Sequence, residues 1–170
     1  ERGYATGCFG KWDLARHSQR GFHPELMPNH QGFDYFFGTP TSNDGFVDLY
    51  RNSVRIEEKA DMAMLTERYT DEAIGFIERN KSKPFFAYVP HTMVHTKLAA
   101  SKKFNGKSKR GLYGDTVEEI DYNVGRIVDV LKKHDLVSIT YFLFTSDNGP
   151  WTMFGPHGGV ARWRDPSYRL

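Results

Sequence analysis

Residues 139–150, ITYFLFTSDNGP, join a strongly apolar run to an abrupt polar end. Short, nearly continuous apolar runs are typical of a strand buried on both faces, as in a parallel sheet. Asp147 and Asn148 follow the run directly. Open α/β sheets bind ligands beyond the carboxyl ends of their strands, and two adjacent oxygen donors there suit a hard cation such as calcium or magnesium. A plain turn is the competing interpretation, because Asp-Asn-Gly-Pro is also ordinary turn sequence.

Upstream of this stretch, strand-type and helix-type patterns alternate. Residues 85–89 form a second buried-strand candidate, and residues 5–12 a weaker one that glycines interrupt. Apolar residues at helical spacing predict helices over 61–80 and 115–133. Strand, helix, strand order with such a crossover forms a parallel βαβ unit. We therefore predict an α/β fold with a mostly parallel sheet flanked by helices.

Local signals support the ends of both predicted helices. Asp61 is placed to cap the first helix, and Asp115 with Glu118 resembles a capping box at the start of the second. A small hairpin is expected within residues 47–58.

Parallel strands present their carboxyl ends at one edge of the sheet, so polar residues that follow each predicted strand should share a rim. If the strand at residues 5–12 is parallel too, its end joins the others. The side chains expected at this rim are Lys11, Asp13, His91, His95, Asp147 and Asn148.

Composition restricts the class of protein. The 170 residues suffice for one domain with a sizeable core. The net charge of +2 is too small to argue for a nucleic-acid partner or an anionic membrane, and no apolar run approaches the roughly 20 residues of a membrane span. Cys8 is the only cysteine, so an internal disulfide is impossible.

Both ends of the sequence look incomplete. Residues 3–6 lead straight into a strand pattern with no element before them, and no helix or strand pattern closes the other end. We expect residues 1–170 to be part of a larger domain, truncated at both ends.

Several segments, taken in order, resemble the sulfatases of the alkaline-phosphatase-like superfamily. They are Gly3–Thr6 with Gly10-Lys11-Trp12, then Gly32–Asp34 with Gly38–Asp44, Lys83–Phe86 with His91 and His95, Tyr113–Asp121, and Thr145–Pro150. The match spans nearly the whole chain in the order of the family. It implies an incomplete sulfatase-like catalytic domain.

The resemblance implies roles for individual residues. Lys11 would face the sulfate oxygens as a cation, and Ser42 would supply a hydroxyl near the substrate. His95, or otherwise His91, would contact the sulfate. The metal ligands would be Asp147 and Asn148. Considered alone, these positions are also compatible with a solvated lysine, a turn serine and structural histidines.

Two departures from the family pattern matter for activity. The family nucleophile is a formylglycine made from Cys or Ser in a Cys/Ser-x-Pro-x-Arg motif, whereas Cys8 is followed by Phe9-Gly10-Lys11-Trp12. This nucleophile and the paired metal-binding aspartates are expected before Glu1, outside this chain. Asp13 stands where the family has a catalytic histidine, and its negative charge should oppose sulfate binding.

The resemblance therefore implies a sulfuric ester hydrolase that depends on Ca²⁺ and formylglycine, although this chain alone is expected to be inactive. The implied substrate is a sulfated small molecule or glycan, and the family suggests a secreted, periplasmic or lysosomal protein. A phosphoester or phosphonate-ester hydrolase of the same superfamily is one alternative. Another is a non-catalytic relative that binds sulfated glycans, which Asp13 favours. The sequence is silent on the oligomeric state and on which natural substrate is used.

Overall fold

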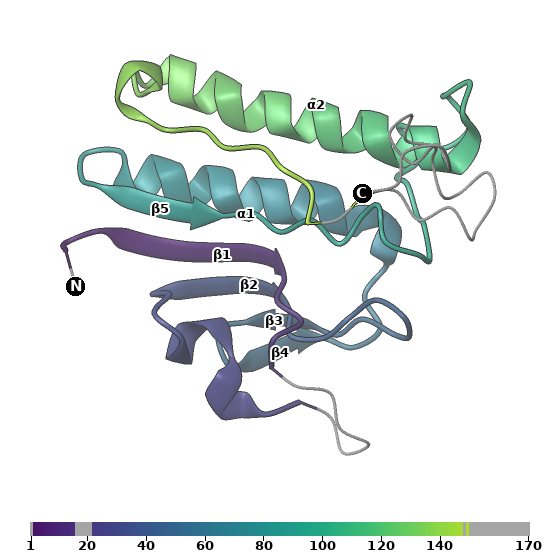
Figure 1. Cartoon of the computed structure of the whole chain (residues 1–170), viewed down its shortest axis with the longest axis horizontal. Helices are drawn as coiled ribbons and strands as arrows, with labels where there is room; N and C mark the ends of the chain where they lie inside the picture. Colours follow the sequence, from purple (N-terminus) through teal and green to yellow (C-terminus); the bar gives the residue numbers. More distant parts are fainter. Residues whose placement is uncertain (1, 16–21, 148, 150–170) are drawn as a thin grey trace, which may run out of the picture.

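The computed structural model describes residues 2–15, 22–147 and 149. In these ranges the chain forms a five-stranded sheet of order β4-β3-β2-β1-β5 with two long helices (Figure 1). The strands are β1 (Ala5–Lys11), β2 (Tyr35–Thr39), β3 (Leu49–Arg51), β4 (Val54–Glu57) and β5 (Phe85–Tyr88), and the helices are α1 (Leu65–Asn80) and α2 (Gly111–Lys133). Short 3-10 helices lie at η1 (Pro24–Leu26), η2 (Pro28–His30), η3 (Met62–Met64) and η4 (Val137–Ile139).

The sheet is mixed, with its parallel part around β1. This strand pairs in parallel with β2 on one side and β5 on the other, whereas β3 and β4 continue the sheet in antiparallel fashion. The α/β fold with helices against a sheet is thus confirmed. The predicted strands at 5–12 and 85–89 are β1 and β5, and the expected hairpin is β3–β4.

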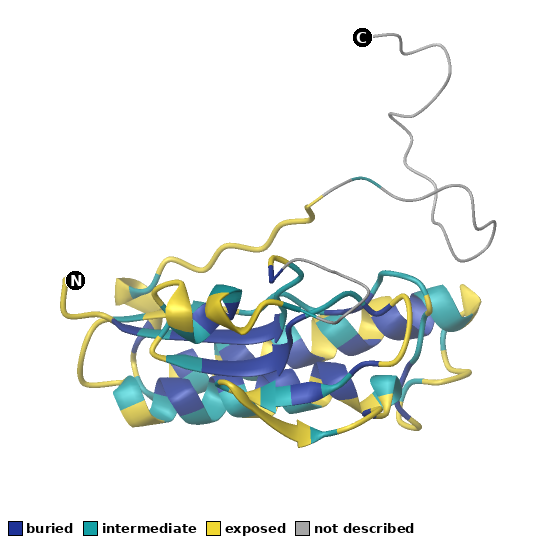
Figure 2. Cartoon of the chain, turned by 90° about the horizontal axis from the view of Figure 1, so that it is seen from below, coloured by how far each residue is buried: buried dark blue, intermediate teal, exposed yellow. Residues whose placement is uncertain are grey.

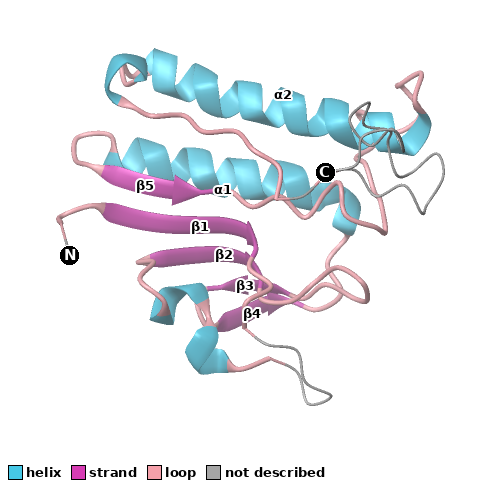
Figure 3. Ribbon diagram, viewed as in Figure 1, coloured by secondary structure: helices cyan, strands magenta, loops and turns pink. Residues whose placement is uncertain are grey.

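Side chains of the central strands alternate between two apolar layers. Phe9 faces α1, where its ring lies 5.3 Å from that of Phe76, and both belong to the larger core. Cys8 faces the opposite side with Phe36 and Met27, beneath the segment that carries η1 and η2. Helix α1 packs against β1, β2 and β5, whereas α2 packs on α1 and lies beyond the β5 edge of the sheet (Figure 3). Burying each large apolar side chain contributes about 1.5–3 kcal/mol.

Glycines allow the backbone to crowd at the carboxyl end of β1. Gly10 has a φ of +145°, and a side chain there would collide with the carbonyl of Pro90. Gly38 is its partner on β2, where a side chain would collide with the Gly10 carbonyl. The ends of β1 and β2 and the segment after β5 can therefore approach closely only because these positions lack a Cβ.

Helix starts are partly as predicted. The carboxylate of Asp61 accepts a hydrogen bond from the Ala63 amide at 3.0 Å, which caps η3 and leads into α1. The capping-box prediction at Asp115 is wrong, because α2 begins four residues earlier at Gly111. Asp115 instead accepts three backbone N–H groups of the preceding loop, from Gly106, Lys107 and Ser108. These bonds lower the pKa of its carboxyl and order the loop.

The prediction of a buried strand at residues 139–144 is wrong for the described structure. The segment follows η4 as extended chain without pairing to any described strand, and Tyr141 and Leu143 are 98% and 88% exposed. Figure 2 shows it as an exposed line outside the packed layers. An apolar run indicates that a segment tends to be buried, but it becomes a strand only where a neighbouring strand is available for backbone pairing. The expected parallel neighbourhood with residues 85–89 is therefore absent.

Candidate functional site

The carboxyl ends of the three parallel strands meet at one edge of the sheet (Figure 1). Lys11 ends β1 in register with Thr39, the last residue of β2. The Lys11 amide donates to the Pro90 carbonyl at 2.8 Å, and the Trp12 amide donates to the Thr39 carbonyl at 2.9 Å. The backbone itself thus joins Lys11 to the loop after β2 and to the loop after β5.

Lys11 carries the cation of this edge. Its side chain is 20% exposed, and its ammonium lies 3.7 Å from the Asp13 carboxylate. Asp13 has a φ of +55°, a left-handed conformation that Asp tolerates better than most residues. The turn after β1 therefore aims a carboxylate back at the lysine, and the two charges partly neutralise each other.

His95 lies in the loop after β5 and is held by the loop after β2. The buried Asn43 side chain donates through Nδ2 to the carbonyl oxygens of His95 and Thr96, at 3.3 and 3.1 Å. The His95 Nδ1 lies 2.6 Å from the Thr96 carbonyl, which can only accept, so Nδ1 carries the proton. Nε2 is then the ring nitrogen that can exchange a proton with a ligand. Asp44 lies 4.0 Å from the same ring.

Asn43 is the residue that sequence reasoning missed. It directly follows Ser42, the serine singled out for its hydroxyl, which lies in the same loop and is half-buried. The sequence did contain a signal that Asn43 belongs to the site, because Asn43 falls within the segment 38–44 that resembles the family. Its role of joining two loops depends on a contact 52 residues away along the chain.

His91 differs from His95 in its environment. Its Nδ1 is buried without a hydrogen-bond partner among the described residues. Burial lowers the pKa of the His91 imidazole to about 4, so the ring is neutral at pH 7. A neutral ring with a buried nitrogen is a poor contact for an anion, and His95 is the better candidate of the two.

Of the two expected metal ligands, Asp147 lies within the described residues. Asp147 is exposed at the end of the extended segment, and its charge contributes to the raised pKa of Tyr88 on β5, after burial and the Cys8 thiol. Asn148 lies outside the described residues. No group of three or more His, Cys, Asp or Glu side chains suited to a metal occurs in the described ranges. The described side chains by themselves therefore do not fit a calcium ion, which takes six to eight oxygen ligands.

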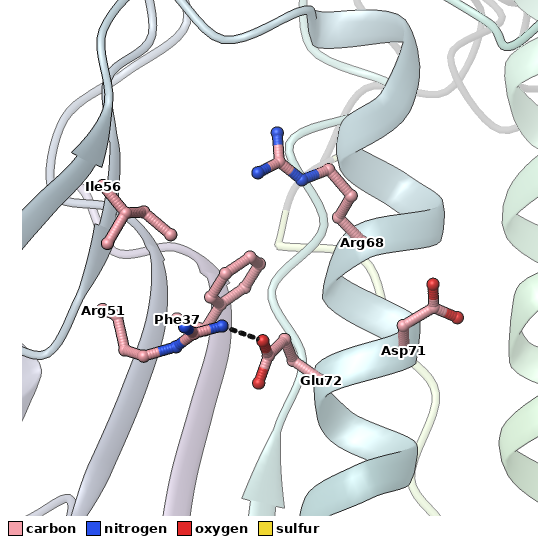
Figure 4. A pocket seen from close by; sticks show the side chains of 6 residues that line it. All are labelled: Phe37, Arg51, Ile56, Arg68, Asp71 and Glu72. Carbon is pink, nitrogen blue, oxygen red and sulfur yellow. Dashed lines mark hydrogen bonds and ion pairs between the residues drawn. The ribbon is translucent and has the colours of Figure 1, made fainter.

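A pocket of about 380 Å³ lies between the β3–β4 hairpin and α1 (Figure 4). It is a poor site for an anion, because each of its two arginines is already paired with a carboxylate. Arg51 forms an ion pair with Glu72, and Arg68 pairs with Glu57 at 2.6 Å. Asp71 pairs with Arg126 of α2 at 2.5 Å. Because its charges are matched, this pocket is part of the packing between hairpin and helices.

No helix in the described ranges is long and apolar enough to cross a membrane.

Comparison with known proteins gives the family. A model of the family described as Sulfatase matches residues 1–168. An arylsulfatase of Hemicentrotus pulcherrimus is 34% identical over 177 residues, covering 95% of this chain and 32% of that protein. The N-acetylgalactosamine-6-sulfatase of Homo sapiens is 35% identical over 175 residues, covering 92% of this chain and 32% of that protein. The chain thus spans about a third of the length of these curated relatives.

Solved structures agree on the fold. The PsFucS1 sulfatase of Pseudoalteromonas sp. matches with a TM-score of 0.77 at 23% identity, over 95% of this chain and 39% of that one. A structure from Bacteroides thetaiotaomicron, described under the metabolism of multiple glycosaminoglycans, matches with a TM-score of 0.77 at 25% identity, over 88% of this chain and 44% of that one. The sheet with its two helices is therefore the corresponding part of the alkaline-phosphatase-like fold, and the chain belongs to the sulfatase family.

Proposed function

We propose that this chain is part of the catalytic domain of a sulfatase that hydrolyses sulfate esters. The observation that carries the proposal is the convergence of Lys11 and the His95 loop at one edge of the sheet, in a chain of the sulfatase family. A cation and a histidine at such an edge suit an anionic group that must be held while its ester bond breaks. Residues 1–170 would form one part of that domain.

In this proposal Lys11 binds the sulfate oxygens and His95 exchanges a proton through Nε2. Hydrolysis breaks the bond between sulfur and the ester oxygen, takes up water, and releases the alcohol and inorganic sulfate. The alcohol oxygen gains a proton as it leaves, and a positioned general acid typically contributes about 10²–10⁴-fold. Ser42 would contact the substrate from the same loop as Asn43. Asp13, beside Lys11, would stand at the position where the family has a proton-transfer histidine.

A calcium ion and a formylglycine, proposed from the family, would supply charge stabilisation and the nucleophile. Asp147 and Asn148 are proposed as two of the metal ligands, with the remaining ligands and the nucleophile outside residues 1–170. The proposed substrates are sulfated small molecules or glycans. The names of the relatives, arylsulfatase and N-acetylgalactosamine-6-sulfatase, support both kinds of substrate.

The carboxylate of Asp13 favours a second candidate function, which is binding of sulfated glycans without turnover. Its position 3.7 Å from the Lys11 ammonium reduces the positive charge available to a sulfate. Such a protein would retain the anion site while lacking efficient proton transfer.

Turnover of 4-nitrophenyl sulfate and 4-nitrophenyl phosphate by the full-length protein tests the proposal. A sulfatase should hydrolyse the sulfate far faster than the phosphate. Lys11→Ala should then reduce kcat/KM for the sulfate, while Lys81→Ala, at an exposed site beyond α1, should leave it unchanged. Preference for the phosphate would indicate the phosphoester-hydrolase alternative, and binding of sulfated glycans without turnover would indicate the second candidate function.

A further inference from the structure

Helix α1 begins at the end of the sheet where β1, β2 and β5 finish (Figure 1). Its second turn carries Tyr69, which is fully buried, and the Tyr69 ring meets the ring of Phe37 on β2 edge-on at 6.3 Å. Burial raises the pKa of the Tyr69 phenol, so its hydroxyl keeps its proton at neutral pH. A buried hydroxyl is costly unless it forms a hydrogen bond, so Tyr69 needs a buried partner.

This partner is Thr92, in the loop after β5. The two hydroxyl oxygens lie 3.0 Å apart, and both side chains are buried. The Thr92 hydroxyl forms no other hydrogen bond within the described ranges. Tyr69 is therefore the one described residue whose hydrogen bond holds the Thr92 side chain, across 23 residues of sequence.

Thr92 opens the turn that ends at His95. The Thr92 backbone carbonyl accepts a hydrogen bond from the His95 amide at 3.3 Å. At the other end of the turn, the Asn43 side chain donates to the carbonyl groups of His95 and Thr96. Helix α1 therefore holds the start of the turn, while the loop after β2 holds its end.

We propose that Tyr69 is a positioning residue for His95, and that it acts through the Thr92 hydroxyl and the turn between Thr92 and His95. It would fix the direction of the His95 Nε2 without touching the substrate. Losing a hydrogen bond of this kind costs about threefold to tenfold in an equilibrium. A misplaced proton-transfer group slows the chemical step, because the transfer requires the reacting atoms to lie within hydrogen-bond reach.

This inference rests on the proposed sulfatase function, in which His95 exchanges a proton with the substrate. It gives a part in catalysis to α1, whose buried apolar side chains otherwise belong to the core. A purely structural bond between Tyr69 and Thr92 would lower stability alone. Positioning would instead lower kcat, leave KM nearly unchanged, and loosen the turn at His95.

The test measures hydrolysis of 4-nitrophenyl sulfate by the full-length protein. Tyr69→Phe keeps the ring and removes the hydroxyl, so kcat should fall by about threefold to tenfold while KM stays within about twofold of wild type. Thr92→Val should have the same effect, whereas Thr92→Ser, which keeps a hydroxyl, should retain wild-type kcat. The double variant Tyr69→Phe/Thr92→Val should lose no more than either single variant, because all three lack the same bond.

Thr70→Val is the matched control, at the next position of α1. The Thr70 hydroxyl is fully buried and donates to the Thr66 carbonyl within the helix at 2.9 Å. This variant therefore removes a buried hydrogen bond of the same helix that does not reach the loop after β5. Its kcat should equal that of wild type.

Hydrogen exchange of the same variants reports on the turn without relying on activity. The His95 amide donates to the Thr92 carbonyl, so its exchange should become about threefold faster or more in Tyr69→Phe and in Thr92→Val. It should be unchanged in Thr70→Val. Mass spectrometry with peptide fragmentation measures the exchange of this amide.

The outcomes separate the two proposals. If wild type hydrolyses 4-nitrophenyl sulfate, the positioning role is overturned by an unchanged kcat in Tyr69→Phe, by an equal loss in Thr70→Val, or by a double variant that multiplies the two single losses. The proposed function stays intact in each of these cases. If wild type does not hydrolyse the sulfate, the proposed function fails and hydrogen exchange decides the role of Tyr69. Wild-type exchange of the His95 amide in Tyr69→Phe then overturns it.

Discussion

The side-chain Nδ2 of Asn43 donates a hydrogen bond to the backbone carbonyl of His95 at 3.3 Å, across 52 residues of sequence. A second bond, to the neighbouring Thr96 carbonyl at 3.1 Å, makes the contact bidentate. The loop after β2 thereby positions the loop after β5, on which the candidate histidine stands. Because Asn43 is fully buried, its amide cannot exchange these partners for water without local opening.

Replacing Asn43 should cost stability. Asn43→Ala removes the side-chain donor to the half-buried His95 carbonyl and one of the two donors to the Thr96 carbonyl, and we expect a loss of about 1–3 kcal/mol in the free energy of unfolding. Urea denaturation measures this loss. Asn105→Ala, at an exposed position whose side chain forms no hydrogen bond with any residue that the structure describes, serves as the control. An unchanged midpoint for Asn43→Ala would show that the two loops hold their positions independently.

Removing the negative charge at Asp13 should improve sulfate chemistry. Asp13→His in the full-length protein places a group that can become cationic beside Lys11. It also removes the carboxylate that lies 3.7 Å from the Lys11 ammonium and neutralises part of its charge. We expect turnover of 4-nitrophenyl sulfate to rise by about tenfold or more. Asp13→Asn removes the charge without supplying a proton-transfer group, so it should lower KM more than it raises kcat. A fall in kcat for both variants would identify Asp13 as an adapted catalytic residue.

His91 should make stability fall in acid. Its folded-state pKa of about 4 lies below the ordinary histidine value of 6.5, so the unfolded chain binds more protons between these values. Stability is therefore unaffected above about pH 6.5 and decreases as the pH falls toward 4, by on the order of 2–3 kcal/mol. Urea unfolding at pH 4.5 and 7.5 measures the difference.

His91→Leu should flatten this dependence, whereas His30→Leu, at an exposed site, should preserve it. A slope that is the same in His91→Leu and in wild type would assign the acid sensitivity to other groups.

The exposed run after η4 should make the isolated chain prone to association. Tyr141 and Leu143 are almost fully exposed within a segment of high β propensity, which is the pattern of an aggregation-prone stretch. Leu143→Lys should lower light scattering at high protein concentration without changing the free energy of unfolding, because the side chain has no packing to lose. Val54→Lys, exposed on β4, should have a smaller effect. Equal scattering of Leu143→Lys and wild type would contradict this assignment.

The sequence by itself determined the elements whose signals are local. Helical spacing of apolar residues placed α1 within 61–80, and the apolar run at 85–89 became β5, because periodicity reports which side of an element faces the core. It also placed Lys11 at the carboxyl end of its strand, since a strand end is marked by the change from apolar to polar residues. The family resemblance, carried by ordered short motifs, was equally local and was confirmed.

The tertiary structure alone decided which distant groups meet. Residues 139–144 have the composition of a buried strand, yet no described edge pairs with them, because backbone partners are chosen by long-range geometry and not by the segment itself. Asp115 was predicted to cap the second helix, but it lies within the first turns of α2. The preceding loop folds back so that three of its backbone N–H groups donate to the Asp115 carboxylate. The bond from Asn43 to the His95 carbonyl likewise exists only when separate loops are brought to one edge of the sheet, a juxtaposition that no local pattern encodes.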